Sequence, residues 1–82
     1  MTGYQPKKRR TWYRRAIRAL AATGQDFEAS DILHELRRIG SPYLDGHAIS
    51  GSIQRAVSKG IAEEVDSYPG THHIVRVWRG VS

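Results

Sequence analysis

The apolar side chains between residues 11 and 23 recur at helical spacing. The positions that share one face of a helical wheel are Trp12, Tyr13, Ala16, Ile17 and Leu20. Such a stripe predicts a helix that buries one side against a core. We expect Thr11 to cap this helix and Gly24 to end it, since hydroxyl side chains accept from the free N–H groups at a helix start and glycine adopts the left-handed conformation at a helix end.

A second helix is predicted from Ser30 to Ile39. Its apolar positions are Ile32, Leu33, Leu36 and Ile39. Ser30 is the expected cap, Asp31 lies at the positive end of the helix dipole, and Gly40 ends the helix. Phe27 is the single apolar residue of the short extended piece that precedes this helix.

A third helix is predicted to begin at Asp45 or His47 and to run to about Lys59. It follows a turn, because Pro42 disfavours helical geometry in the residue before it. Gly60 ends it. The positions that we expect to be buried are Ile49, Ile53, Ala56 and Val57.

The rest of the chain has the pattern of a β-hairpin. Side chains alternate between two faces over Ile61–Ser67. A second strand is predicted from about His72 to Arg79, with Ile74 and Trp78 on one face and Val75 and Val77 on the other. Between these segments, residues 68–71 place Pro69 and Gly70 where a type II turn favours them. The element order predicts an α+β fold, with a three-helix core and a C-terminal β-hairpin.

The length of 82 residues leaves room for one modest hydrophobic core and therefore one domain. We divide the chain into a flexible basic arm, residues 1–10, and a folded domain, residues 11–82. The sequence contains no cysteine, no apolar run long enough for a membrane span, and no apolar segment behind its basic start that would make a secretory signal. These features are typical of a cytoplasmic protein.

The net charge of +5 is unevenly distributed along the chain. Residues 1–25 contain no acid but seven of the thirteen cations, which are Lys7, Lys8, Arg9, Arg10, Arg14, Arg15 and Arg18. A positive field of this kind attracts polyanions such as nucleic acid. The alternative is a solvated, solubilising surface, although such surfaces usually mix the two signs of charge.

The outer face of the third predicted helix carries short polar and basic side chains. It consists of His47, Gly51, Gln54, Arg55 and Ser58, flanked by Ser50 and Lys59. A helix fits the major groove of B-DNA, where arginine pairs with guanine and glutamine with adenine. We therefore expect Arg55 and Gln54 to read bases, and Lys59 to bind a phosphate. An ordinary solvated face is the alternative interpretation.

Gly51 lies inside this helix, where glycine costs about 1 kcal/mol relative to alanine. Two reasons for such a residue are open at this point. One is close approach of a ligand to the helix backbone, which the position opposite the apolar stripe favours. The other is tight contact with a neighbouring helix.

The element order resembles the winged helix-turn-helix superfamily over residues 11–79. The most telling stretch runs from His47 to Val65 (HAISGSIQRAVSKGIAEEV) and is similar to a recognition helix that continues into the first strand of a wing. The resemblance implies a small bacterial or bacteriophage protein that binds duplex DNA, as a transcription regulator or a recombination accessory factor associated with the nucleoid. The sequence pattern predicts no additional dimerisation helix, so we expect a monomer or weak dimer.

The hairpin carries no lysine or arginine near its predicted tip, where Tyr68, Thr71, His72 and His73 lie. Three acids at its base, which are Glu63, Glu64 and Asp66, would be repelled by phosphate. Arg76 and Arg79 return positive charge only on the second strand. Whether the hairpin contacts DNA is therefore undecided, and the basic arm is favoured as the segment that contacts DNA instead.

Two other functions fit a winged-helix scaffold, which also serves in protein and RNA recognition. The first is a protein-interaction module that uses the hairpin with Tyr43 and Leu44. The second is RNA or single-strand binding through Tyr4, Trp12 and Tyr13, because aromatic side chains among cations stack on bases.

The sequence offers no pattern for catalysis, a cofactor or a metal. Adjacent strand residues point to opposite faces, so His72 and His73 are not expected to chelate one ion, and the same holds for Glu63 and Glu64 as a catalytic pair. No glycine-rich phosphate loop is present. We therefore expect a protein that is not an enzyme, with no cofactor, no small-molecule substrate and no membrane partner.

Overall fold

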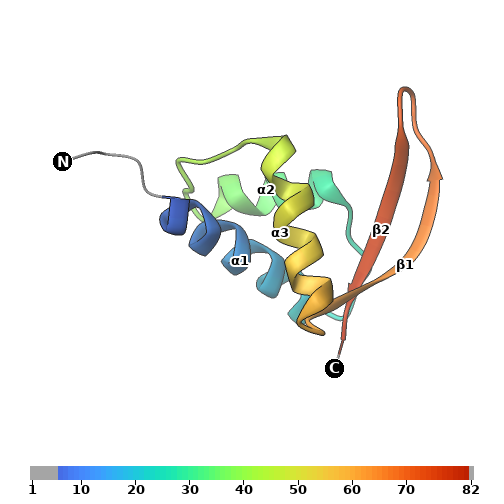
Figure 1. Cartoon of the computed structure of the whole chain (residues 1–82), viewed down its shortest axis with the longest axis horizontal. Coiled ribbons are helices and arrows are strands. Elements are labelled where there is room, and N and C mark those ends of the chain that lie inside the picture. The colour runs from blue at the N-terminus through green and yellow to red at the C-terminus, as the bar shows by residue number, and fades with distance from the viewer. Residues whose placement is uncertain (1–5, 82) are drawn as a thin grey trace.

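The computed structural model describes residues 6–81, with the side chains from Arg9 onward. Its elements are α1 (Pro6–Ala22), α2 (Ala29–Arg38), α3 (Gly46–Ser58), β1 (Ala62–Pro69) and β2 (Ile74–Gly80). Three helices pack together, and the two strands form an antiparallel hairpin that extends beyond them (Figure 1). The predicted α+β fold, a three-helix core with a C-terminal wing, is confirmed.

Helix α1 begins five residues earlier than the sequence pattern predicted. The flexible arm is wrong for residues 6–10, which are helical, and Thr11 is therefore not the cap. Proline suits the first position of a helix, because its fixed φ is helical and its missing N–H has no partner there anyway. Lysine and arginine are also good helix formers. Residues 1–5 of the predicted arm lie outside the described residues.

Helix α2 begins at Ala29, so Ser30 is not its cap. The cap is Glu28, whose backbone N–H donates to Asp31 Oδ2 over 2.8 Å. A carboxylate three residues after the cap can reach back in this way and satisfy a free N–H group. Asp31 lies in the first turn, as predicted.

Helix α3 begins at Gly46, with Asp45 as its cap. Asp45 Oδ1 accepts from the backbone N–H of His47 over 2.9 Å, which confirms the first of the two predicted starts. The expected burial of Val57 is wrong, because its side chain is 40% exposed. Val57 lies at the edge of the apolar stripe and faces a hollow between α3 and the hairpin. Positive φ angles after the three helices confirm the predicted stops at Gly24, Gly40 and Gly60.

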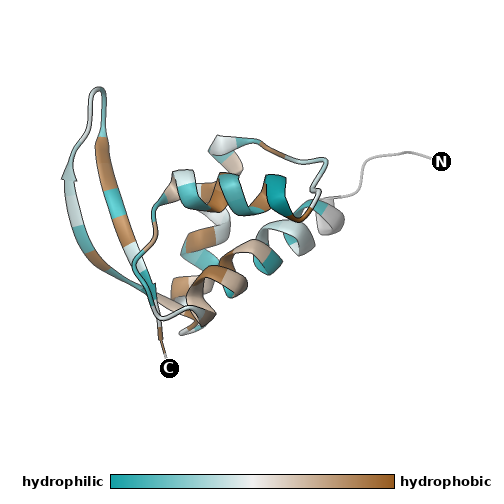
Figure 2. Cartoon of the chain, turned by 180° about the vertical axis from the view of Figure 1, so that it is seen from behind, coloured by the Kyte–Doolittle hydropathy of each residue, from teal (hydrophilic) through white to brown (hydrophobic). Residues whose placement is uncertain are grey.

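The core lies where the three helices meet the base of the hairpin. Its buried members are Tyr13, Ala16, Ile17, Phe27, Ile32, Leu36, Ile49, Ile53, Ala56, Ala62 and Trp78. Hydrophobic residues on the helices and along the strands appear brown in Figure 2. The hydroxyl of Tyr13, which is fully buried, accepts from the Asp45 N–H over 2.7 Å and donates to the Asp45 carbonyl over 3.0 Å. These two bonds fix the start of α3 against α1.

The hairpin loop differs from the predicted turn. Pro69 pairs with Ile74, so the loop covers residues 70–73, and the Gly70 N–H donates to the His73 carbonyl over 2.7 Å. Proline is tolerated at a strand end, where no ladder N–H is needed, and the turn therefore moves two residues along. Val65 forms a bulge between paired Glu64 and Asp66.

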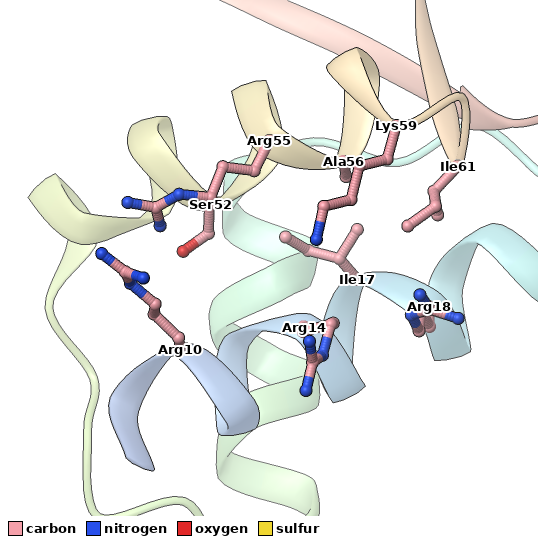
Figure 3. A pocket seen from close by; sticks show the side chains of 9 residues that line it. All are labelled: Arg10, Arg14, Ile17, Arg18, Ser52, Arg55, Ala56, Lys59 and Ile61. Atoms are coloured by element: carbon pink, nitrogen blue, oxygen red, sulfur yellow. The ribbon is translucent and has the colours of Figure 1, made fainter. Parts of the chain in front are cut away.

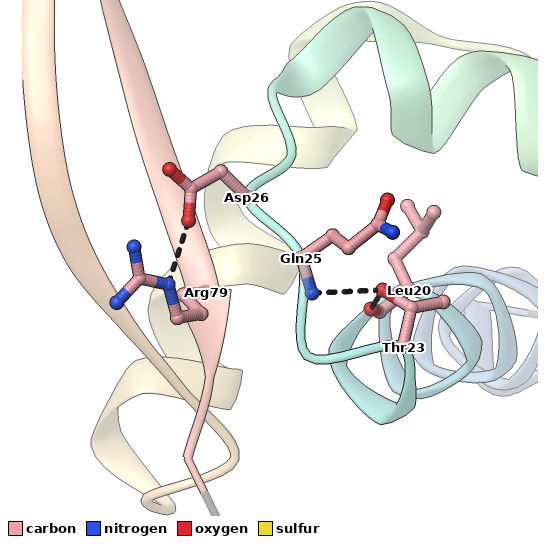
Figure 4. A network of polar contacts seen from close by, with 5 residues as sticks. All are labelled: Leu20, Thr23, Gln25, Asp26 and Arg79. Carbon is pink, nitrogen blue, oxygen red and sulfur yellow. Dashed lines mark hydrogen bonds and ion pairs between the residues drawn. The ribbon is translucent and has the colours of Figure 1, made fainter.

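Polar and backbone contacts join the hairpin to the segment between α1 and α2. Phe27 and Trp78 exchange two backbone hydrogen bonds of 2.8 Å, and Arg79 donates to Asp26 over 2.7 Å (Figure 4). Near the other end of the hairpin, the Tyr68 hydroxyl donates to Glu28 over 2.6 Å. A Cβ at Gly80 would collide with the backbone of Ala21, so β2 approaches the end of α1 closely. The hairpin is therefore held along much of its length.

Candidate nucleic-acid interface

A pocket of about 140 Å³ lies between α1 and α3, and cations from both helices line it. The cations are Arg10, Arg14 and Arg18 of α1, Arg55 of α3, and Lys59 just after α3. The other lining residues are Ile17, Ser52, Ala56 and Ile61. In Figure 3, Arg10 and Arg55 turn toward the end marked by Ser52, and Lys59 points across toward α1.

Helical spacing explains why these cations form two facing rows. Arg10, Arg14 and Arg18 follow one another at four-residue intervals, so they lie on one side of α1 with a rise of about 6 Å between them. On the other helix, Ser52 and Arg55 are three residues apart, and Lys59 follows after four more. The packing of α1 against α3 then brings the two rows together.

The charge of this pocket is not neutralised by the protein. In residues 9–81, whose side chains the structure describes, no ion pair involves any of its five cations. The ion pairs lie elsewhere and are Glu35–Arg38 at 2.6 Å, Glu64–Arg76 at 3.0 Å and Asp26–Arg79 at 2.7 Å. The bond to Asp26 raises the pKa of Arg79, and the bond to Arg38 lowers the pKa of Glu35. The unpaired positive charge is thus concentrated between α1 and α3.

All seven α3 residues proposed from the sequence are exposed. They are His47, Ser50, Gly51, Gln54, Arg55, Ser58 and Lys59. A hollow of about 390 Å³ runs along five of them, from Gly51 to Lys59. Another, of about 340 Å³, joins His47 and Gly51 to Arg9 and Arg10 of α1. Arg55 lines both hollows and the α1–α3 pocket, so it lies where the three meet.

Gly51 is not required by helix packing. A Cβ placed on it would meet no atom within 4 Å. The interpretation in which Gly51 allows tight contact with a neighbouring helix is therefore wrong. Its backbone is open to the outside of α3.

Arg14, Arg15 and Arg18 are all exposed, as predicted, but Arg15 does not line the pocket. Its guanidinium lies 5.1 Å from the ring centroid of Trp12, in a cation–π contact. Arg14 and Arg18 instead line the pocket. Residues four apart share a side of a helix, whereas Arg15 is turned away from that side.

The N-terminal residues fall into two groups. Arg9 and Arg10 line the hollow at the start of α3, while the side chains of Lys7 and Lys8 lie outside the described part of the structure. Tyr13 is fully buried, so it has no face on which a base could stack.

Ser52 is a site residue that the sequence analysis did not identify. It is half-buried and lines both the pocket and the hollow at the start of α3. The wheel separated a buried stripe from an outer face and left the side of α3 that meets α1 unassigned. The spacing of Ser52 before Arg55 and Lys59 was the available signal.

The other side of α3 faces the hairpin across a hollow of about 580 Å³. Gln54, Val57 and Ser58 line it from α3. The ion-paired Glu64 and Arg76 line it from the hairpin. The outer face of α3 is thus bordered by an unpaired cationic wall on one side and a neutralised wall on the other.

Within the described part of the chain, no three metal-binding side chains come together, and no helix is long and apolar enough to cross a membrane. No protein-family model, curated protein or solved structure matches the sequence or fold of this chain. The geometry of the α1–α3 surface is therefore the observation that bears on function.

Proposed function

We propose that this chain binds double-stranded DNA with a preference for sequence, placing the outer face of α3 in the major groove. One observation carries the proposal: the exposed, acid-free face of α3 lies beside the unpaired cations of α1. Groups suited to base edges and groups suited to phosphates are thus presented together. Protein–DNA interfaces need both, because phosphate contacts position a protein and base contacts give specificity.

The side chains of α3 suit direct readout of bases. A helix of about 10–12 Å diameter fits a major groove about 12 Å wide. Gln54 can pair with adenine through two hydrogen bonds, and Arg55 can do so with guanine. The open backbone at Gly51 allows a base edge to approach the helix closely.

The cations of α1 supply affinity that is independent of sequence. Each phosphate that they neutralise releases condensed counterions, so binding weakens as salt rises. Lys7 and Lys8 extend the same positive segment toward the start of α1. The ion-paired Arg76 and Arg79 add little to this field.

The three-helix core with a C-terminal hairpin supports membership of the winged helix-turn-helix superfamily as part of the proposal. We assign the protein to transcription regulation or to an accessory role in recombination, acting on the nucleoid as a monomer or weak dimer. The proposal includes no catalysis, cofactor or membrane partner.

A protein-interaction surface at the hairpin with Tyr43 and Leu44 is the second candidate. One observation favours it, since the exposed fraction is 43% for Leu44 and 63% for Ile74. Tyr43, however, packs against the core. Capture of a partner that survives both nuclease treatment and high salt, by a chain that fails to bind DNA, would favour this function.

The test of the proposed function is duplex binding followed by selection of preferred sequences from a random pool. Against the selected site, Gln54→Ala should lose about 1–3 kcal/mol of discrimination, or about 5–150-fold, because it removes a bidentate base contact. Arg55→Ala should lose both discrimination and general affinity. Fluorescence anisotropy with selected and scrambled duplexes measures both quantities.

Arg37→Ala is the matched control, because Arg37 is an exposed arginine of α2 outside the pocket and hollows that border α3. It should change neither discrimination nor, by more than a small factor, affinity. The proposed function is overturned if the full chain shows no affinity for any duplex at low salt.

A further inference from the structure

We propose that the α1–α3 pocket is a discrete phosphate-binding site that takes one phosphodiester group of a DNA strand. That the phosphate comes from DNA rests on the proposed function, whereas the ability of the pocket to bind a phosphate does not. A free phosphate ion offers the same oxygen acceptors and serves as the simplest probe.

The composition of the pocket selects an acceptor-rich anion. Arginine and lysine side chains only donate hydrogen bonds, and five of them line this space. The Ser52 hydroxyl is the only lining side chain that can also accept. In the major groove the edge of each base pair presents a donor together with acceptors, whereas phosphate oxygens only accept. The pocket therefore fits a phosphate better than a base.

The floor of the pocket strengthens this preference. Ile17 is 1% exposed and Ala56 is 6% exposed, and Ile61 is half-buried beside them. Charges above an apolar floor interact through a lower effective dielectric than charges in open solvent. Guanidinium groups also bind two phosphate oxygens at once, which fixes the orientation of the anion.

The size of the pocket points to a single anionic group. Its volume of about 140 Å³ is less than half that of each neighbouring hollow, where about 340, 390 and 580 Å³ are open. The wider hollows along α3 suit the edges of bases. The narrow pocket between the helices suits one backbone group beside the groove that α3 enters.

This assignment gives Arg55 and Gln54 different roles in DNA binding. Arg55 lines the pocket as well as the outer hollow, so a contact to phosphate competes with a contact to guanine. Gln54 lines only the outer hollows. Gln54 is therefore the specificity-determining residue, and Arg55 belongs in part to the phosphate site.

Five cations line the pocket and none of them is ion-paired in residues 9–81, so we expect their mutual repulsion to lower the stability of the free protein. Neutralising one cation should therefore stabilise the free protein and weaken phosphate binding. These opposite effects distinguish a binding pocket from ordinary surface charge. A structural role for the same arginines would predict loss of stability instead.

The experiment measures thermal unfolding and calorimetric titration of the full chain in sodium phosphate against sodium chloride at equal ionic strength. We expect a saturable rise in Tm with phosphate and binding of one ion per chain. Arg14→Gln and Lys59→Gln should each raise the Tm without phosphate and weaken phosphate binding about tenfold or more, since each removes a charged hydrogen bond.

Arg37→Gln is the matched control, because it removes the same charge from an exposed arginine outside the pocket, and it should keep phosphate binding. The proposal is overturned if phosphate acts no differently from chloride, or if pocket and control variants respond alike. Because Arg14 and Lys59 are exposed, both variants are expected to fold, and either one alone decides the outcome.

Duplex DNA separates this inference from the proposed function. Arg14→Gln and Lys59→Gln should weaken binding to all sequences alike and reduce the salt slope by about one unit each. Binding of phosphate without binding of duplex would sink the proposed function and leave the pocket as a site for free phosphate or a nucleotide. Duplex binding that Arg14→Gln weakens no more than Arg37→Gln would sink the pocket alone.

Discussion

Gly51 lies in the second turn of α3, on its exposed face. Since a Cβ there meets no atom within 4 Å, Gly51→Ala should stabilise the free protein by up to about 1 kcal/mol. The added methyl group would stand between the helix backbone and a base edge, so DNA affinity should fall while stability rises. Urea unfolding and anisotropy titration measure the two effects.

Ser30→Ala, at an exposed position of α2, is the control and should leave DNA affinity unchanged. If Gly51→Ala raises stability with no loss of affinity, close approach of DNA to the backbone at this position is wrong.

The exposure of a side chain was predictable from the sequence where it depends only on the position of the residue around its own helix. The wheel placed Gln54 and Arg55 on the outside of α3, and both are exposed. It failed for Val57, at the edge of the apolar stripe, because the wheel contains no information on how closely the hairpin covers that edge. Arg15 is exposed as predicted, but the wheel does not give its contact with Trp12.

The side of the hairpin that faces α3 carries an ion pair whose charges neutralise each other. Glu64 and Arg76 are 3.0 Å apart and line the hollow beside Gln54. Glu64→Gln should release Arg76 for a phosphate, raising duplex affinity and steepening the salt dependence by up to about one unit. Anisotropy titration over a range of salt concentrations measures both.

Glu63→Gln is the comparison, because it removes the same charge from the neighbouring strand position without releasing Arg76. Equal effects of the two variants would mean that only net charge matters and that the hairpin wall does not face DNA.

Element boundaries were predictable where one residue controls them. Glycines with positive φ ended all three helices as predicted, because few other residues adopt that conformation easily. The starts of α1 and α2 were missed, because Pro6 and the Glu28–Asp31 pair competed with equally plausible hydroxyl caps. The hairpin loop was displaced because Pro69 was assigned to the turn rather than to the strand end.

Across the whole molecule, α1 and α3 carry only positive charge, whereas acids and cations are mixed in α2 and the hairpin. None of the eight acids lies within α1 or α3, whereas α1 alone holds seven of the thirteen cations. Such a field should steer the cationic side toward DNA, so the association rate should fall steeply with ionic strength. Stopped-flow fluorescence should show a larger loss of association rate for Arg14→Gln than for Arg37→Gln. Equal losses would show that net charge alone governs the encounter.

The fold class was predictable in full, but the site only in part. Composition and spacing identified the cations of α1 and the polar face of α3. Spacing along a helix fixes where a side chain points relative to its own axis, but core packing determines which helix lies opposite. The meeting of Arg14 with Lys59 around one pocket, and the place of Ser52 there, therefore required the tertiary structure.

The hydroxyl of Tyr13 affects which polyanions the α1–α3 surface can distinguish. It holds the start of α3 to α1 through two hydrogen bonds to the backbone of Asp45, so a sliding of the helices past each other would leave the hydroxyl of the buried Tyr13 without these partners. We therefore expect the separation of the two helices that carry the cations to vary little. Polyanion binding by two rows of cations at a fixed separation depends on the spacing of the negative charges along the polyanion and not only on their density. Stiff polymers with a regular repeat, such as a duplex, should be favoured over flexible chains of equal charge.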